Sequence, residues 1–398
     1  MAAENFLDLM NGRVKLLGQE MPKDYGVVYI DDYVRNADGV SDNTAQVQKA
    51  YDALDSHGMV VWGPHTYRID PIIPPNVAFT TMGAGMTRTR IRSLRANGSL
   101  FNLTGLNGPA KTFMDIKLEG KDTGVVGGSA IVCKGTNGVL LERVWVAGMD
   151  KGIDWHSSSF ISTNNCVFES CTIAAAFATA PTESMMRGTS YYSCTTDLSL
   201  AGDCSTFIHS ESTHVDTHET GISLVGATQA TVTNAGFASA GGGWKPTLCR
   251  IAKASTGNRV SLKSHGIGLV GVEFNASTGN FAEVNFDGVG TGVKYISADH
   301  NTVGAGEITN SSTADFAQTG TTWAYFDDNL KANFAGLSGV NVGKRLPNGT
   351  REFYIAGAPA STAGFNNGDK WRNTAAASGA ANCYQLAAGV WKAVSRLA

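Results

Sequence analysis

Residues 38–69, DGVSDNTAQVQKAYDALDSHGMVVWGPHTYRI, constrain the fold most, because they predict a turn, a helix and two strands in close succession. The apolar residues of the first half recur at i, i+3, i+4 and i+7, the spacing of one helix face: Val47, Ala50, Tyr51 and Leu54. Asp42 or Asn43 can cap the start of this helix, and a His-Gly pair ends it. Two short strands follow, at 59–62 and 66–69.

The same stretch resembles the opening of the pectate-lyase-like parallel β-helix family. The family pattern runs D-G-x-x-D-[DN]-T-x-x-[IV]-Q-x-A and then, after a short gap, G-x-V-x-x-P-x-x-Y-x-I. The matching residues here are Asp38, Gly39, Asp42, Asn43, Thr44, Val47, Gln48, Ala50, Gly58, Val60, Pro64, Tyr67 and Ile69. In that family the segment covers the N-terminal end of a solenoid. The resemblance therefore implies a right-handed parallel β-helix with an N-terminal capping helix, although a fold does not name a reaction.

Short alternating apolar strands fill the middle of the chain and are separated by Gly, Asn, Ser and Thr. Their spacing of roughly twenty residues is typical of the coils of a parallel β-helix. An all-β sandwich would show the same alternation, but the helix ahead of the strands and the lack of hairpin dipeptides favour the solenoid. We predict an all-β chain with the cap and first coils at 24–110 and the β-helix at 111–335. The Gly- and Pro-rich part of the first region, 70–110, is expected to be irregular.

The two ends of the chain differ from the solenoid repeat. Residues 1–23 are an apolar leader or neck, and residues 345–398 are predicted to form a small β module for trimerisation or carbohydrate binding. The stretch GDKWRNTAAASG…YQLAAGVWKAV resembles the C-terminal module of many phage tail fibres and tailspikes, G-D-x-x-x-N-x-x-x-x-x-G…G-x-W-K. Its matching residues are Gly368, Asp369, Asn373, Gly379, Gly389, Trp391 and Lys392.

Taken together, the cap and the tail resemble a phage tailspike or tail-fibre polysaccharide depolymerase. The resemblance implies a homotrimer that binds and cuts a bacterial surface polysaccharide, such as a capsule, an O-antigen or an exopolysaccharide. It also implies attachment to phage tail or baseplate proteins in the virion, after assembly in the host cytoplasm. The long N-terminal domain of many tailspikes is missing, so either the chain is truncated or it attaches through its leader.

Composition agrees with these expectations. Charged residues make up only 16% of the chain and the formal net charge is −3, so we expect no nucleic-acid partner. Neither a secretory signal nor an apolar run long enough for membrane insertion is present in the sequence. The seven cysteines are odd in number and form no C-x-x-C pair, which indicates buried thiols in a reducing compartment rather than disulfides or a metal site.

The candidate catalytic residues lie in Phe207–Gly221, FIHSESTHVDTHETG, the densest group of carboxylates and imidazoles. Strand alternation is expected to place His214, Asp216 and His218 on one face, with Glu219 at the next turn. We predict that Asp216 and Glu219 share the acid and base or nucleophile roles and that His218 orients one of them. The remaining members are expected to contact substrate: His209, Glu211 and His214. The alternative is a solvated or stacked polar strand without catalytic function.

Three further groups are expected to contact the glycan. In GMDKGIDWHSS, Trp155 offers a ring face beside Asp154 and His156; the alternative is a coil corner with a buried tryptophan. The insertions PTESMMRG and GGGWKP could shape the binding face through Glu183, Arg187 and Trp244, or be ordinary loops. The pair Asp327-Asp328 is predicted to be a turn.

These patterns favour glycoside hydrolysis over a lyase reaction, because paired carboxylates are present and no Lys/Arg cluster sits beside them. No cofactor is expected, apart from calcium if the chain is a lyase, and no metal is expected on the histidines, whose i, i+4 spacing suits a helix better than a strand. A non-enzymatic receptor-binding fibre and a sugar O-deacetylase stay open as alternatives.

Overall fold

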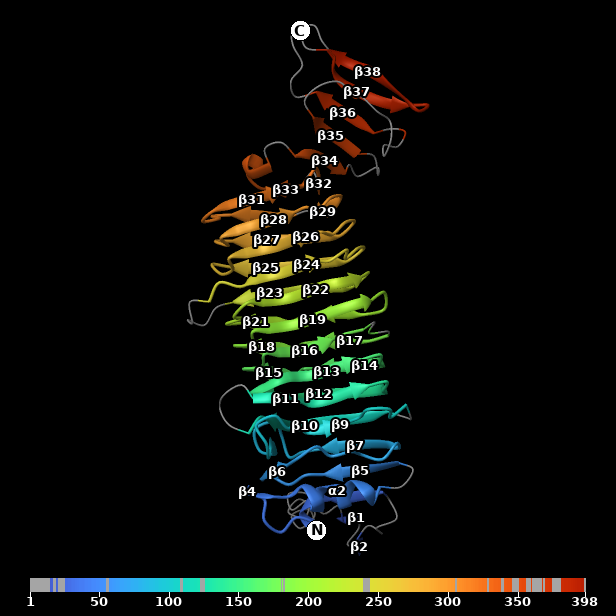
Figure 1. Cartoon of the computed structure of the whole chain (residues 1–398), viewed down its shortest axis with the longest axis vertical. Coiled ribbons are helices and arrows are strands. Elements are labelled where there is room, and N and C mark those ends of the chain that lie inside the picture. Colours follow the sequence, from blue (N-terminus) through green and yellow to red (C-terminus); the bar gives the residue numbers. More distant parts are fainter. Residues whose placement is uncertain are drawn as a thin grey trace. The chain divides into compact units, whose positions relative to one another are not determined.

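The computed structural model describes residues 15–16, 19–20, 26–54, 57–107, 110–121, 126–179, 181, 183–238, 244–304, 306–327, 329–337, 340–345, 351–355, 359, 367, 369–373 and 381–396. The chain divides into two compact units. Unit 1 comprises residues 1–223 and 239–244, and unit 2 comprises 224–238 and 245–398. In both units most strands pair in parallel with the strand one coil away, which is the architecture of a parallel β-solenoid (Figure 1).

Each coil of unit 1 contributes strands to three parallel stacks. Stack I consists of β3 (Val27–Tyr29), β5 (His57–Val61), β7 (Ala78–Met82), the first halves of β10 (Lys111–Glu119) and β12 (Asn137–Ala147), β14 (Ser159–Asn164), β17 (Met185–Arg187) and β20 (Ile208–Ser210). Stack II consists of β4 (Asp38–Asp42), β6 (Thr66–Ile69), β8 (Arg90–Ser93), the second halves of β10 and β12, β15 (Val167–Glu169), β18 (Ser190–Tyr192) and β21 (Thr213–Val215). Stack III consists of β9 (Phe101–Asn102), β11 (Val126–Lys134), β13 (Met149–His156), β16 (Ile173–Phe177) and β19 (Thr196–Asp203).

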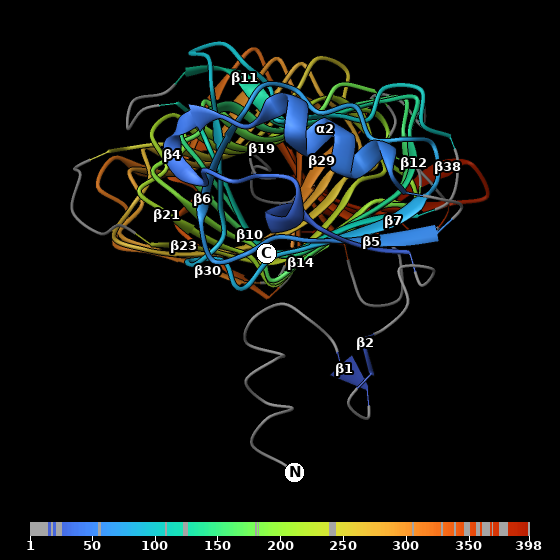
Figure 2. The ribbon, with the colours of Figure 1, turned by 90° about the horizontal axis from the view of Figure 1, so that it is seen from below.

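The predicted helix is present as α2 (Thr44–Asp52), after the short 3-10 helix η2 (Ile30–Asp32) (Figure 2). The side-chain oxygen of Asp42 accepts a hydrogen bond from the backbone N–H of Thr44 at 2.9 Å, which satisfies one of the free donors at the helix start. The predicted apolar face is buried: Val47, Ala50, Tyr51 and Leu54. The ring of Tyr51 lies 5.7 Å from Phe79 and 5.9 Å from Phe101, so the helix packs on the aromatic core of the first coils. Its role as a cap of the solenoid stays a prediction.

The expected irregular stretch at 70–110 is more regular than its composition indicates, because it contains β7, β8 and β9. In β8 the sequence Arg-Ile-Arg-Ser alternates, and Ile91 and Ser93 are buried while Arg90 and Arg92 point outward. Glycine and proline mark the turns between these strands rather than an extended loop. The expectation of irregular structure was therefore wrong for this part of unit 1. Two short antiparallel strands, β1 (Lys15–Leu16) and β2 (Gln19–Glu20), lie within the predicted leader.

Unit 2 repeats the three stacks. Stack I contains the first part of β23 (Thr231–Ala238), β25 (Arg259–His265), β27 (Phe281–Asp287), β29 (Asn301–Val303), β32 (Trp323–Asp327) and β34 (Asn341–Arg345). Stack II contains the second parts of β23, β25 and β27, followed by β30 (Gly306–Thr309) and β33 (Leu330–Lys331). Stack III contains β24 (Thr247–Ala252), β26 (Val270–Asn275), β28 (Thr291–Ile296) and β31 (Ala314–Thr319). The division between the units falls within β22 (Thr220–Thr228), and η3 (Phe334–Leu337) follows β33.

A ladder of buried asparagines supports the turns of unit 2. The amide of Asn258 donates to the side-chain oxygen of Asn280 at 2.8 Å, and Asn280 donates in the same way to Asn301 at 2.8 Å. Each amide also donates to a backbone carbonyl, for example Asn258 to Ala227 at 2.9 Å. Because these amides are buried and their donors are paired, each hydrogen bond contributes about 1 kcal/mol to stability.

The C-terminal part of unit 2 departs from the solenoid pattern. β35 (Arg351–Ile355) runs antiparallel to β34 and parallel to β36 (Lys370–Asn373), and antiparallel pairs join β36 to β37 (Ala381–Ala387) and β37 to β38 (Val390–Arg396). The rings of Trp371 and Trp391 meet at 5.8 Å. Gly368 and Gly379 of the predicted tail pattern lie outside the described residues.

All seven cysteines are buried and none of them is in a disulfide, as the sequence predicted. In the described ranges no helix is both long and apolar enough to cross a lipid bilayer.

Candidate functional site

A groove of about 460 Å³ lies on the outer face of stack II in unit 1. Strand alternation points every second residue outward, and the parallel register aligns these residues from coil to coil. One outward row joins Arg90 of β8, Lys117 of β10 and Trp145 of β12. The next outward row, two residues further along each strand, contains Arg92, Glu119, Ala147 and Glu169.

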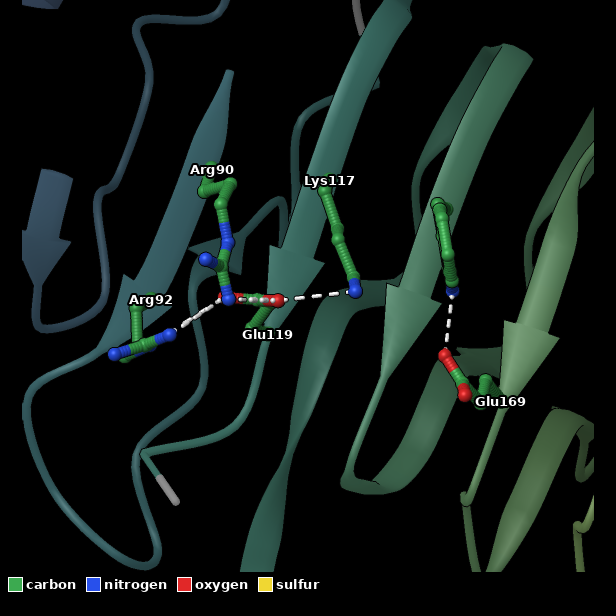
Figure 3. Close-up of polar contacts among 6 residues, drawn as sticks. Arg90, Arg92, Lys117, Glu119 and Glu169 are labelled. Carbon is green, nitrogen blue, oxygen red and sulfur yellow. Dashed lines mark hydrogen bonds and ion pairs between the residues drawn. The ribbon is translucent and has the colours of Figure 1, made fainter. Parts of the chain in front are cut away.

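Glu119 is the centre of the charge network in this groove. Its carboxylate accepts two hydrogen bonds from Arg90, from Nη2 at 2.8 Å and from Nε at 3.0 Å. Arg92 Nη2 donates at 3.1 Å, and Lys117 Nζ lies 3.1 Å from the other oxygen. Figure 3 shows the carboxylate between the two arginines on one side and the lysine on the other. Both oxygens of Glu119 are thus engaged by cations.

The surroundings of Glu119 keep it ionised. Burial would raise the pKa of this carboxyl, but the hydrogen bonds from Arg90 and Lys117 outweigh it and lower the pKa below its usual range. A carboxylate that is ionised and saturated with donors is a poor proton donor. Its contacts instead fix the positions of three long cationic side chains.

Trp145 connects this network to a second carboxylate. Lys117 Nζ lies 3.8 Å above the centre of the Trp145 ring, a cation–π contact, and Trp145 Nε1 donates to Glu169 Oε2 at 3.0 Å. Glu119 and Glu169 are aligned two coils apart, so their Cα atoms lie about 9.5 Å from each other. Glu169 is half-buried at the end of β15 and lines the groove.

The groove is positively charged although the chain is acidic overall. Arg90, Arg92, Lys117 and Lys121 line it together with Glu119 and Glu169, which gives a formal charge of +2. Such a surface suits an anionic ligand. It does not suit calcium, because the cations occupy the oxygens of Glu119. Within the part of the chain that the structure describes, no three acidic, histidine or cysteine side chains are arranged to hold a metal.

No motif in the sequence pointed to this groove. Its residues come from four segments between 90 and 170, and none of these segments is rich in carboxylates or histidines. One signal was available, because arginines alternate in Thr-Arg-Thr-Arg-Ile-Arg at 87–92 with the period of a strand. The alignment of these arginines with Lys117 and Glu119 depends on the lengths of the coils between them.

The histidine-rich segment, Phe207–Gly221, does not form one outward strip. His214 is fully buried: its Nδ1 lies 2.8 Å from Asp197 Oδ2 and its Nε2 lies 3.0 Å from Ser212 Oγ. Thr217 donates to the same oxygen of Asp197 at 2.6 Å. The order Ser–His–Asp resembles a nucleophile triad. However, Ser212 is only 3% exposed and the other two are closed to solvent, so the network belongs to the core.

His209 is also inside the core, with its ring centre 6.0 Å from that of Tyr191 and 6.1 Å from that of His214. Burial lowers the pKa of His209 and of His214 to about 3, so both imidazoles are neutral at physiological pH. Burial raises the pKa of Asp197. The prediction that His209 and His214 contact substrate was wrong, and strand alternation failed because left-handed residues at Glu211 and Asp216 break the segment into short strands and turns.

The other members of the segment lie at the surface, in separate contacts. Glu211 is exposed and pairs with Arg187 at 3.0 Å, which lowers the pKa of the Glu211 carboxyl. His218 stacks on Trp244 with ring centres 4.2 Å apart, and Trp244 is 49% exposed. Asp216 is half-buried and Glu219 is exposed in the turn between β21 and β22. The catalytic assignment of Asp216, His218 and Glu219 stays a prediction.

The group at 154–156 is divided between core and surface. Trp155 is 1% exposed and packs 4.8 Å from Phe177, so its predicted role as a sugar platform was wrong. The odd-numbered residues of this part of β13 face inward. Asp154 faces the other way and contacts Lys151 at 2.8 Å and His156 at 3.0 Å. Glu183 is exposed in the loop before β17, and Asp327 ends β32, while Asp328 lies outside the described residues.

No protein-family profile matches the chain, and a search of curated proteins finds no match either. Solved structures do match. Tailspike protein 3 of bacteriophage CBA120 aligns with a TM-score of 0.56 at 12% identity, over 94% of this chain and 69% of that one. DFA-IIIase from Arthrobacter chlorophenolicus A6 aligns with a TM-score of 0.59 at 10% identity, over 78% of this chain and 97% of that one. The catalytic domain of Agl-KA aligns with a TM-score of 0.54 at 13% identity, over 80% of this chain and 66% of that one.

At these identities the similarity is one of fold. It confirms the right-handed parallel β-helix that residues 38–69 predicted, and a phage tailspike is among the proteins that share it. The chemistry of the chain has to be argued from its own side chains.

Proposed function

We propose that the chain binds and cleaves an acidic bacterial surface polysaccharide, with the groove around Glu119 as its glycan site. One observation carries the proposal: Glu119 holds Arg90, Arg92 and Lys117 together in a groove of formal charge +2. Each guanidinium has five N–H donors and Glu119 accepts only some of them, so the remaining donors can bind the carboxylate of an acidic sugar. Trp145 beside them offers part of a ring surface to a pyranose.

The charge of the groove favours elimination over hydrolysis. In an elimination on a uronic acid, a base takes the proton next to the carboxylate, a C4–C5 double bond forms, the C4–oxygen bond breaks and the leaving oxygen takes up a proton. The negative charge that develops on the uronate would be stabilised by Arg90, Arg92 and Lys117. Glu169 is the proposed base, because it lines the groove and is oriented by Trp145.

Hydrolysis requires a carboxylic acid that can donate a proton and a second carboxylate at a suitable distance. Glu119 does not fit either role, since its pKa is lowered and both of its oxygens are paired. The expectation of hydrolysis therefore depends on Asp216 and Glu219, which keep that role as the alternative within this proposal.

A receptor-binding fibre that does not cut its glycan is the second candidate. It is favoured by the saturation of Glu119, which leaves Glu169 as the one groove carboxylate without a cation within 4 Å among the described residues. A site with one available carboxylate can bind a polyanion without cleaving it.

Assembly is part of the proposal. We infer a homotrimer in a phage tail, attached to other tail proteins, because the fold is shared with a phage tailspike and the ends of the sequence resemble those of tailspikes. Light scattering at micromolar concentration should give three times the mass of the chain. A monomer under these conditions would exclude the trimer.

The experiment that tests the function compares matched polymers. The chain should be incubated with polygalacturonate, alginate, hyaluronate and a set of acidic capsules, and in parallel with neutral dextran. Elimination predicts products that are shorter, carry an unsaturated uronate and absorb in the ultraviolet. New reducing ends without that absorbance would indicate hydrolysis, binding without products would indicate a fibre, and cleavage of neutral polymers alone would refute an acidic substrate.

A further inference from the structure

Unit 2 has a groove of its own, of about 350 Å³, on the outer face of its stack II. It is lined by strands β25, β27, β30 and β33. Gly306 lies in its floor, and a Cβ at this position would come within 1.8 Å of the carbonyl oxygen of Val284. Position 306 therefore cannot carry a side chain, and the floor of the groove stays open.

The side chains that line this groove are ordered by the parallel register. Lys263, Asn285, Glu307 and Lys331 are aligned on four successive strands, at about 4.8 Å per step. Glu283 lies two residues before Asn285 and points to the same outer face, because the residue between them, Val284, is buried. The groove thus presents a regular row of donors and acceptors.

These polar groups are available to a ligand. Lys263, Glu283, Asn285, Glu307 and Lys331 are all exposed, and within the described part of unit 2 none of the four charged ones has an ion-pair partner within 4.0 Å. The groove around Glu119 is different, since its cations are already paired with a carboxylate. Two lysines and two glutamates give the unit 2 groove a formal charge of zero.

We propose that this groove is a second saccharide site, one that binds an uncharged glycan segment through its hydroxyl groups. Sugar hydroxyls donate and accept hydrogen bonds. Glu283 and Glu307 accept, the two lysines donate, and the amide of Asn285 does both. Because the formal charge is zero, the groove has no net attraction for a polyanion. The proposal stands on this groove alone and does not depend on the function proposed for unit 1.

The test is a titration of the full chain with neutral oligosaccharides, namely maltoheptaose, cellohexaose, laminarihexaose and isomaltoheptaose. Binding is followed by calorimetry and by saturation-transfer NMR. At least one probe should bind, and its affinity should change little between about 0.05 and 0.5 M salt, because no net charge is neutralised. The double variant Glu283→Gln/Glu307→Gln should weaken binding by about tenfold or more, as two hydrogen-bonded acceptors lose their charge.

Two controls make the result decisive. Lys392→Ala removes an exposed lysine on β38, outside the groove, and should leave the affinity unchanged. Arg90→Gln/Arg92→Gln alters the unit 1 groove and should also leave it unchanged. If the glutamine pair does not fold, Lys263→Gln/Lys331→Gln serves the same purpose. The proposal is overturned if none of the four probes binds at millimolar concentration, or if groove variants bind as tightly as the parent chain.

Discussion

Two regions of unit 1, the groove around Glu119 and the histidine-rich segment Phe207–Gly221, differ in how their charged side chains are brought together. The segment holds the densest run of carboxylates and imidazoles in the chain, yet two of its histidines are in the core and the rest are divided among separate contacts. The groove has no dense run at all. Arg90, Arg92 and Lys117 are nevertheless all bonded to Glu119.

The difference follows from the geometry of a solenoid. A strand of one coil contributes only one or two outward side chains to a given place on the surface, and the neighbours of each side chain come from the coils before and after it. Arg90 and Glu119 are 29 residues apart in the sequence but share a bidentate ion pair. A surface site on this fold is therefore assembled across coils, whereas a dense local run is shared between the core, the turns and the surface.

The largest expected effect is on turnover, and it tests which of the two regions holds the catalytic residues. Glu169→Gln should lower cleavage of an acidic glycan by a factor of about 10² to 10⁴, since it removes the proposed base, while glycan binding persists. Asp216→Asn and Glu219→Gln should each retain activity close to that of the parent chain. Product formation, measured by ultraviolet absorbance and by reducing ends, shows which of these variants loses activity. If the variants at 216 and 219 are inactive and Glu169→Gln is active, the catalytic site belongs to the turn after β21.

A second, smaller effect concerns binding. Arg90→Gln/Arg92→Gln removes two positive charges from the groove and should weaken binding of an acidic oligosaccharide by about tenfold or more. It should also flatten the dependence of affinity on salt, because fewer charges are neutralised on binding. Arg187→Gln, an exposed arginine beside Glu211, is the matched control and should change neither quantity. An equal loss in the control would show that the groove has no special role.

The third prediction compares the two carboxylates that hold arginines in these regions. Glu119→Gln should lower the free energy of unfolding by about 3 kcal/mol, because a nearly buried carboxylate with three cationic partners loses its charge. Glu211→Gln removes an exposed pair and should have no measurable effect. Denaturant midpoints of the two variants test this. Similar losses at both positions would mean that Glu119 does not organise the groove.

The fourth prediction uses the core position of His209. Its pKa is about 3 in the folded chain and about 6.5 when unfolded, so the unfolded state binds an extra proton between these values. Stability is therefore lost as the pH falls below 6.5. When the pH is lowered from 8 to 5, the free energy of unfolding of His209→Leu should therefore rise by about 2 kcal/mol relative to that of the parent chain. Two other titratable groups lie nearby: His214, with its ring centre 6.1 Å away, and Asp197, which is bonded to His214. Both are present in the parent chain and in the variant, so the comparison isolates His209. A difference that does not change with pH would place His209 in contact with solvent.

Much of the fold could be predicted from the sequence. The helix face of Val47, Ala50 and Tyr51 and the strand 66–69 were predicted correctly, because both depend on periodicities within one element. The repeated short strands in the middle of the chain predicted the solenoid. The strands between 70 and 110 were missed, because glycine and proline hid the alternation of Arg90, Ile91 and Arg92.

The candidate site was harder to predict for two physical reasons. The register between coils depends on the number of residues in every turn, and a difference of one residue would turn Glu119 away from Arg90. The direction of His209 and His214 depends on left-handed residues at Glu211 and Asp216, which are not glycines and give no signal in the sequence. A histidine in a polar run can also lie in the core, since hydrogen bonds to Asp197 and Ser212 satisfy His214 there.

The most direct test of the central claim is hydrogen–deuterium exchange of the chain with and without an acidic oligosaccharide, using oligogalacturonate, oligoalginate and hyaluronate fragments as probes. Binding should slow exchange in peptides that cover Arg90–Ser93, Lys111–Glu119 and Val167–Glu169, and leave Phe207–Gly221 unchanged. Protection confined to Phe207–Gly221, or no protection of the three groove strands by any acidic probe, would contradict the account.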